Sequence, residues 1–245
     1  MKRVGVWGMA KVVVGLLIVW QLLAMALRIA FIPTPVDVII NIYHIFSAKI
    51  ALHLLMSLMR IVAGLAASIV IGVPLGLCMG WFPSWNKHLS PLVYLTYPIP
   101  KIALLPLVML IFGLGELSKI LMILMIVVFQ IIVSMRDAVA GITKETFYSM
   151  TSLGARRRDV FRMAVFPASL PALLSSVRVS LGTALSVLFF TETFGTQYGL
   201  GYFIMDSWMR VNYTDMFSGI LILSVLGLLL FGLVDLLERI LCRWR

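Results

Sequence analysis

The amino-acid sequence predicts an all-α membrane protein with six transmembrane helices. Of the 245 residues, 62% are hydrophobic and only 12% are charged, and the mean hydropathy is +1.07. Soluble domains carry about 25% charged residues, so a soluble fold cannot bury this much apolar surface. The apolar residues gather in long stretches, and about 20 of them span a bilayer as a helix. The bilayer is therefore part of the solvent of this chain.

Six apolar stretches, separated by polar or proline-rich segments, are the expected spans. They cover residues 12–32, 54–81, 89–112, 118–133, 170–190 and 216–237. The first resembles a cleavable signal peptide because Ala24-Met25-Ala26 looks like a cleavage site. Its apolar run continues past Arg28 to Ile32, which is long enough to span, so we expect it to be retained.

The segments between the spans complete the expected organisation. Residues 36–49 are mildly amphipathic and are expected along the outer surface, while residues 84–88 and 191–215 are expected to be polar loops. The chain is thus divided into an N-terminal part, residues 1–53, with the first helix and the outer-surface segment, and a core, residues 54–245. The core holds five spans and a basic loop at about residues 144–168.

Two spans carry residues that an ordinary apolar helix lacks. Gly72, Gly76 and Gly80 recur every four residues and share one helix face, which lets a second helix approach closely. The third span is interrupted by Pro98 and Pro100, and prolines this close together break a straight helix. Such a break is tolerated in a membrane only where protein or a water-filled cavity satisfies the freed backbone groups.

The distribution of the basic residues fixes the expected orientation. With both termini in the cytoplasm, 13 of the 20 basic residues lie inside, four lie within spans, and only three lie outside. The outer three are Lys49, Lys119 and Arg210. The net charge of +10 is therefore explained by membrane topology, and we expect no nucleic-acid partner.

No catalytic, metal or nucleotide site is expected in this chain. The two cysteines, Cys78 and Cys242, are far apart, and the three histidines follow no metal-binding spacing. The sequence also has no phosphate-binding GxxxxGK[ST] motif. We therefore expect a non-catalytic membrane subunit that itself holds no metal and no cofactor.

The long basic interruption is the segment most suited to meet a partner in water. Residues 145–153 favour a short helix, Gly154 permits a reversal through positive φ, and residues 155–165 favour a second helix. Pro167 and Pro171 are expected to stop this second helix before the fifth span. Two interpretations remain open: a device that transmits a push to the membrane helices, or an inert loop whose arginines only set the topology.

This segment resembles a known motif. Residues 154–171, GARRRDVFRMAVFPASLP, resemble the EAA loop of binding-protein-dependent ABC importer permeases. Further similarities to the sulfonate, nitrate and taurine branch, within residues 33–202, are Pro33-Thr34-Pro35, Tyr97-Pro98-Ile99-Pro100, Phe112-Gly113-Leu114-Gly115, Gly182, Glu192 and Gly199-Leu200-Gly201-Tyr202. The Glu-Ala-Ala positions are occupied by Tyr148, Ser149 and Met150, so the acidic contact of the family is absent there. Glu145, one helical turn earlier, is the alternative acidic group.

The resemblance implies a type I ABC importer permease with a cytoplasmic coupling helix. Its partners would be a cytoplasmic ATPase dimer that binds ATP and Mg, an extracytoplasmic solute-binding protein, and a second copy of the chain. It would lie in a bacterial inner membrane and import a small anion such as a sulfonate, nitrate or taurine. The residues that would couple to the ATPase are Tyr148, Met150, Gly154, Ala155, Arg157, Arg158, Phe161 and Pro167. The alternative is a secondary transporter without an ATPase.

Polar residues inside the spans are the candidates for the translocation pathway. With the proline break they are Tyr97, Pro98, Pro100, Lys101, Gln130, Arg178 and Glu192. Lys101 could attract an anion or pair with a helix end. Gln130 could form an interhelical hydrogen bond instead. Glu192 could pair with Arg60 or with Arg178 in a structural role.

Overall fold

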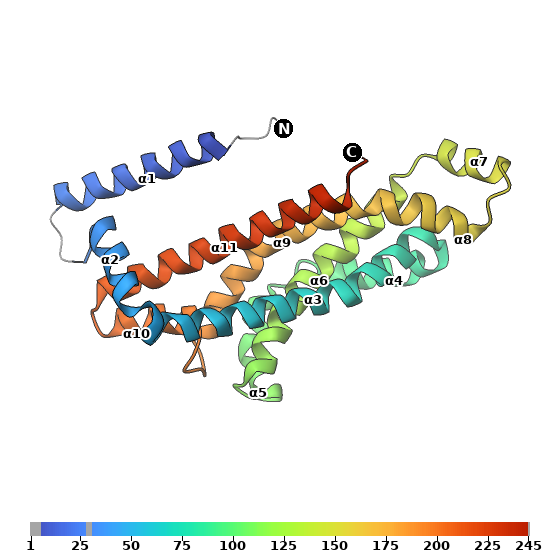
Figure 1. Cartoon of the computed structure of the whole chain (residues 1–245). Helices are drawn as coiled ribbons and strands as arrows, with labels where there is room; N and C mark the ends of the chain where they lie inside the picture. The colour runs from blue at the N-terminus through green and yellow to red at the C-terminus, as the bar shows by residue number, and fades with distance from the viewer. Residues whose placement is uncertain (1–5, 28–30, 245) are drawn as a thin grey trace.

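The computed structural model describes residues 6–27 and 31–244, and this part of the chain is helical and contains no strand (Figure 1). The all-α prediction is confirmed. The α-helices are α1 Val6–Leu27, α2 Pro35–Ile45, α3 Ala51–Trp81, α4 Pro83–Thr96, α5 Leu105–Phe112, α6 Glu116–Ala140, α7 Lys144–Ser152, α8 Arg157–Val160, α9 Phe166–Glu192, α10 Leu200–Met209 and α11 Tyr213–Leu241. Two π-helical segments, Phe46–Ile50 and Phe161–Val165, and a 3-10 turn, Lys101–Leu104, join some of them.

The long helices form a bundle, with α3 packed against α6, α6 against α9, and α9 against α11. Helices α2 and α10 lie at one end of the bundle, and α7 and α8 lie at the other (Figure 1). The buried core between the long helices is apolar and includes Ile123, Ile131, Leu181 and Leu188. Helix α1 lies along the outside, where Trp20 stacks on Phe217 of α11.

Four helical runs in the described residues are long and apolar enough to cross a membrane. They are Pro35–Trp81, Glu116–Ala140, Arg157–Glu192 and Tyr213–Leu241. The pair Pro83–Thr96 and Lys101–Phe112, bent by 79°, makes a broken fifth span. The apolar stretch of α1, Lys11–Ala26, is shorter, so the count of six spans stays a prediction. Residues 28–30 of the first expected span, and the basic residues Lys2, Arg3 and Arg245, lie outside the described residues.

The proline break is confirmed, but several expected boundaries are wrong. Residues 84–88 are not a loop, because Pro83 sits at the start of α4, where a proline without an N–H is well accommodated. Residues 36–49 are not separated from the second expected span, because α2 and the π-helical segment continue into α3 as one run of 47 residues. Their place along the outer surface stays a prediction. The expected loop 191–215 contains α10, and α6 extends through Arg136 to Ala140.

The expected stop at Pro167 and Pro171 is also wrong. One helical run continues from Arg157 to Glu192, with Pro167 in the first turn of α9 and Pro171 inside the helix. The π-helical segment Phe161–Val165 lies directly before these prolines. The hydrogen bonds of this segment are shifted to a π pattern, with the N–H of Phe166 bonded to the carbonyl of Phe161, and the helix continues through both prolines.

The glycine row of α3 packs against α6, as its spacing predicts. A Cβ atom on Gly76 would lie 2.6 Å from the carbonyl oxygen of Ile132 and 2.6 Å from the Cβ of Met135. A Cβ on Gly80 would similarly lie 2.5 Å from the Cβ of Val139. The two backbones approach so closely that a side chain has no room, which is the usual reason for small residues at membrane helix contacts.

We predict that Gly76→Ala destabilises the protein by about 1–3 kcal/mol, the usual cost of overpacking a tight contact. The added methyl group meets backbone of α6, which cannot rotate away. Gly232→Ala is the matched control because nothing lies within 4 Å of a Cβ at that helical position. Thermal unfolding in detergent measures the difference, and an equal midpoint for the two variants would contradict the close approach.

Candidate functional site

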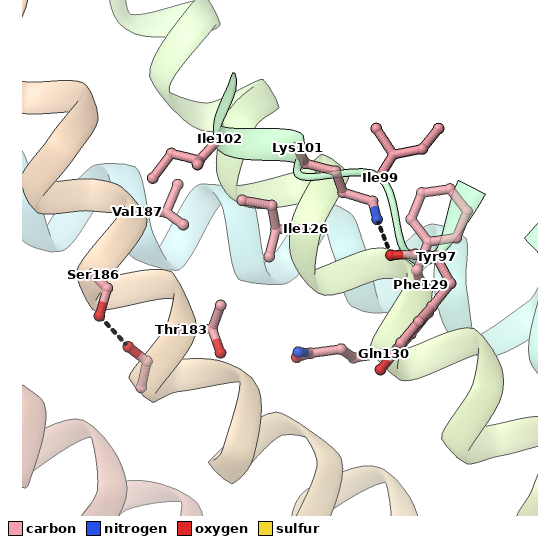
Figure 2. Close-up of a pocket in the computed structure, with 11 residues that line it drawn as sticks. Tyr97, Ile99, Lys101, Ile102, Ile126, Phe129, Gln130, Thr183, Ser186 and Val187 are labelled. Carbon is pink, nitrogen blue, oxygen red and sulfur yellow. Dashed lines mark hydrogen bonds between the residues drawn. The ribbon is translucent and has the colours of Figure 1, made fainter. Parts of the chain in front are cut away.

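The proline break between α4 and α5 opens onto a cavity of about 610 Å³. It lies between the α4–α5 break, α6 and α9 (Figure 2). The lining residues are Tyr97, Ile99, Lys101, Ile102, Ile126, Phe129, Gln130, Gly182, Thr183, Ser186 and Val187. Most of these side chains are apolar, and a small number of polar groups face the same space, which is the usual composition of a small-molecule site.

Lys101 is the charged group of this cavity. Its Nζ donates to the carbonyl oxygens of Thr96, at 2.9 Å, and Tyr97, at 3.0 Å, and lies 4.8 Å from the centroid of the Phe129 ring. Pro100 has no N–H to offer the carbonyl of Thr96 four residues earlier, and the one backbone donor to this carbonyl across the break is the N–H of Ile99 at 3.4 Å. The predicted pairing of Lys101 with a helix end is therefore confirmed, and the same side chain also lines the cavity.

Gln130, Thr183 and Ser186 provide the neutral polar groups. The Oε1 atom of Gln130 accepts a hydrogen bond from the hydroxyl of Ser180 at 2.6 Å, so the predicted interhelical bond is present between α6 and α9. Gln130 and Thr183 point toward one another across the cavity (Figure 2). None of the described lining residues carries a carboxylate. The cavity therefore combines one cation with amide and hydroxyl donors, a set suited to an anion.

The cavity brings together some of the predicted pathway residues and not others. Tyr97, Lys101 and Gln130 line it, and Pro98 and Pro100 shape the break without lining it. Phe129, Thr183 and Ser186 were missed by sequence reasoning. Thr183 and Ser186 lie one turn apart on a long apolar helix, and that polar pair was the available signal.

Arg178 lies away from this cavity. It forms ion pairs with Asp235, at 2.5 Å, and with Glu238, both on α11. The Arg178–Glu192 pairing is wrong, because these residues are 14 positions apart on one helix, roughly 21 Å along its axis. Arg178 therefore ties α9 to α11.

Glu192 belongs to a buried polar cluster at the opposite end of α9. Its Oε1 accepts a hydrogen bond from the Nη1 of Arg60 at 2.7 Å, and both side chains are 0% exposed. Ser57 donates to the same carboxylate at 2.8 Å, and the backbone N–H of Gly201 donates to its Oε2 at 2.8 Å. The Arg60–Glu192 pairing is confirmed, and Glu192 does not line the cavity.

Arg60 joins further segments to this cluster. Its Nε and Nη2 bind the carboxylate of Glu116 at 2.5 and 2.6 Å, and its Nη1 donates to the carbonyl of Tyr198 at 2.7 Å. Glu116 begins α6, and Tyr198 lies in the connection between α9 and α10. One guanidinium therefore holds α3, α6, α9 and that connection together, which is a structural role.

The predicted coupling segment projects beyond the bundle (Figure 1). On α7 and in the turn after it, Tyr148 and Leu153 are 67% and 87% exposed. Gly154 has φ +81°, so the expected reversal through positive φ is confirmed, and the N–H of Ala155 donates to the carbonyl of Met150 at 3.1 Å.

The remaining coupling candidates lie where this segment joins the bundle. Arg157 and Arg158 are exposed at the start of the long helical run. Phe161 contacts the ring of Trp81 edge-on at 6.1 Å, which joins the run to the end of α3. Met150 and Pro167 line a second cavity of about 660 Å³ between α7 and the start of α9. Their contact with an ATPase stays a prediction.

Comparison with known proteins gives a consistent family. A model of the family described as binding-protein-dependent transport system inner membrane component matches residues 68–241. The taurine transport system permease protein TauC of Escherichia coli (strain K12) is 31% identical over 94% of this chain and 86% of its own length. The putative aliphatic sulfonates transport permease protein SsuC of Bacillus subtilis (strain 168) is 31% identical over 87% of this chain and 78% of its own length.

A solved structure supports the same fold. The inward-facing MetNI methionine ABC transporter superposes with a TM-score of 0.67 at 20% identity, over 77% of this chain and 94% of that chain. At this identity the likeness concerns the fold alone. The predicted permease-like architecture is confirmed.

We predict that Arg60→Gln destabilises the protein by about 3–5 kcal/mol, because it leaves the buried Glu192 carboxylate without its cation. Arg210→Gln is the control, because Arg210 pairs with Asp206 at the surface, where such a pair contributes about 0–1 kcal/mol. Thermal unfolding of both variants in detergent tests the difference. A loss for Arg60→Gln no larger than for the control would show that the cluster does not hold these segments.

Proposed function

This chain belongs to the family of binding-protein-dependent transport system inner membrane components and is a permease subunit of an ABC importer, and we propose that it imports a small anion. The observation that carries the proposal is Lys101, a cation at a proline break, in a cavity whose described lining has no carboxylate. The sulfonate group of an aliphatic sulfonate or of taurine, or a nitrate ion, fits this donor set.

The names of three relatives support this substrate class. The names of TauC and SsuC give taurine and aliphatic sulfonates as their substrates, and a nitrate import permease protein of Synechocystis is 22% identical over 94% of this chain. A sulfonate or nitrate offers three oxygens to the donors around it. The Lys101 ammonium would share its hydrogen bonds between the anion and the two helix-end carbonyls. Thr183 and the amide of Gln130 would complete the contacts from α9 and α6.

We further propose that a cytoplasmic ATPase dimer acts on segment 144–168 and thereby changes the shape of this cavity. ATP and Mg would bind to the ATPase and not to this chain. The exposed α7 would enter a cleft of the ATPase. The run Arg157–Glu192 is one helical body, and it carries Thr183 and Ser186 on the cavity wall. A displacement at its first turns would therefore reach the cavity along a continuous helix, through the π-helical segment and the two prolines.

The assembly we propose has two copies of this chain in a bacterial inner membrane, with both termini cytoplasmic and a solute-binding protein at the outer face. The orientation rests on the basic residues, since α7, with Lys144, and α8, with Arg157 and Arg158, lie at one end of the bundle. A secondary transporter without an ATPase is the alternative function. The family membership favours the ATP-driven importer.

Co-purification tests the ATPase partner. Gentle extraction of the tagged chain from its native membrane should bring a stoichiometric ATPase with it, identified by mass spectrometry. Gly154→Pro should lose the ATPase while remaining in the membrane, because proline cannot adopt φ +81°. Gly154→Asn is the control, since asparagine tolerates positive φ. Absence of any ATPase, even after cross-linking through Arg157→Cys, would favour the secondary transporter.

Uptake measurements test Lys101. The probe is labelled taurine, an alkanesulfonate or nitrate, whichever the native chain transports. We predict that Lys101→Met lowers its uptake by about 10- to 100-fold, because one hydrogen bond to a charged group is lost. Lys101→Arg should retain part of the activity. Lys87→Met is the control, because Lys87 is exposed on α4 outside the cavity. Unchanged uptake by Lys101→Met would exclude Lys101 from anion recognition.

A further inference from the structure

A third pocket, distinct from the cavity lined by Met150 and Pro167, lies at the α7 end of the bundle and is not explained by transport. It has a volume of about 640 Å³ and lies between the end of α3 and the start of the run Arg157–Glu192. Pro74, Cys78 and Trp81 of α3 form one wall, and Phe161 and Phe166 form the other. The lining is apolar except for two arginines, Arg157 and Arg158. We call this pocket the α3–α8 crevice.

A span of α3 that starts near Arg60 would place the crevice at the depth of the bilayer surface. From Arg60 to Trp81, α3 rises by roughly 31 Å, which is the thickness of the hydrocarbon core. Trp81 therefore marks the end of the span, where tryptophan is enriched. The run that begins at Arg157 has 36 residues, more than the roughly 20 that the core accommodates, so part of it extends beyond the core, and its arginine-rich first turns suit headgroup level.

The apolar wall continues from the crevice into the bilayer. Val70, Pro74, Cys78 and Trp81 follow at helical spacing on one face of α3, and Val70 is exposed. From Val70 to Trp81 this face is roughly 16 Å long, close to half the thickness of the hydrocarbon core. That length suits a lipid acyl chain in one leaflet.

The two arginines at the crevice are available to an anion. Both side chains are exposed, and neither has a hydrogen bond or an ion pair with any residue that the structure describes. The nearby Asp159 is already engaged, because its carboxylate accepts the backbone N–H of Arg156 at 3.0 Å. Basic pockets between membrane helices on the cytoplasmic side bind lipid phosphates.

From the apolar lining, the depth and the paired arginines, we propose that the α3–α8 crevice binds one anionic phospholipid of the cytoplasmic leaflet. Its phosphate would lie against Arg157 and Arg158, and an acyl chain would follow α3 along Cys78 and Pro74. The leaflet rests on the proposed orientation of the chain. Lipid is favoured over an apolar segment of the ATPase because the crevice continues along the bilayer-facing surface of α3 and its charge matches a phosphate.

The test uses the full chain in nanodiscs and a photoreactive phosphatidylglycerol with a diazirine near the top of one acyl chain. Adducts are mapped by mass spectrometry. We expect them on residues 74–82 and 161–166, about fivefold or more above those of the matching phosphatidylcholine probe. Arg157→Gln and Arg158→Gln should each lower the yield about fivefold. Arg162→Gln is the matched control, because Arg162 lies on the same segment and does not line the crevice.

Two further experiments distinguish a lipid from a segment of the ATPase as the occupant of the α3–α8 crevice. Cys78→Trp fills the crevice and should abolish the adducts, whereas Cys78→Ser should keep them. The experiment is repeated with the co-purified ATPase bound, where labelling should persist. Equal labelling by the two probes, insensitivity to both arginine variants, or loss of labelling on ATPase binding would each overturn the proposal. The chain is labelled without its ATPase first, so failure here is distinct from failure of the proposed transport function.

Discussion

The constraint on which this structure depends is that backbone polar groups within a bilayer must be hydrogen-bonded by the protein itself. Along their length the helices satisfy this constraint through their own backbone hydrogen bonds. At the break around Pro98 and Pro100 the helical hydrogen bonds are interrupted. There the ammonium of Lys101 binds the carbonyls of Thr96 and Tyr97. A lysine that satisfies freed carbonyls beside a cavity places a positive charge in the membrane, so the break and the proposed anion site have one physical origin.

The features that the sequence predicted well depend on local chemistry. Composition and apolar length identified the helical membrane class, the spacing of Gly72, Gly76 and Gly80 predicted a close contact with another helix, and paired prolines predicted the broken span. The φ of +81° at Gly154 belongs to the same group. In each case the residues that define the feature are neighbours in sequence, so no knowledge of the tertiary structure is needed.

The features that were missed depend on tertiary contacts or on continuity between elements. Arg178 pairs with Asp235 and Glu238 because of the register of α9 against α11, which no local pattern encodes. Thr183 and Ser186 could be assigned to the cavity only once α9 was placed opposite the proline break. Pro167 and Pro171 suggested a helix end, and the continuous run shows that the preceding π-helical segment and the position of Pro167 in the first turn accommodate them.

The two ends of α9 differ in their contacts with the rest of the bundle, and this difference would decide how the helix responds to a displacement of its first turn by the proposed ATPase. Its last residue, Glu192, is held by Arg60 and Ser57 of α3 and by Gly201 of α10, so this end is anchored to two other helices. Within the described part of the chain, its first turns contain no buried ion pair; they are packed through Ser169 and the preceding Val165, and the hydroxyl of Ser134 donates to the carbonyl of Ala172 at 3.2 Å. Thr183 lies nine residues from the anchor and Pro167 lies 25 residues from it, so a tilt about Glu192 moves the cavity wall by roughly one third of the displacement at Pro167. The buried cluster around Arg60 and Glu192 would then be the fixed point of the tilt. Its burial would matter because the fixed point has to stay in place while the rest of the helix moves.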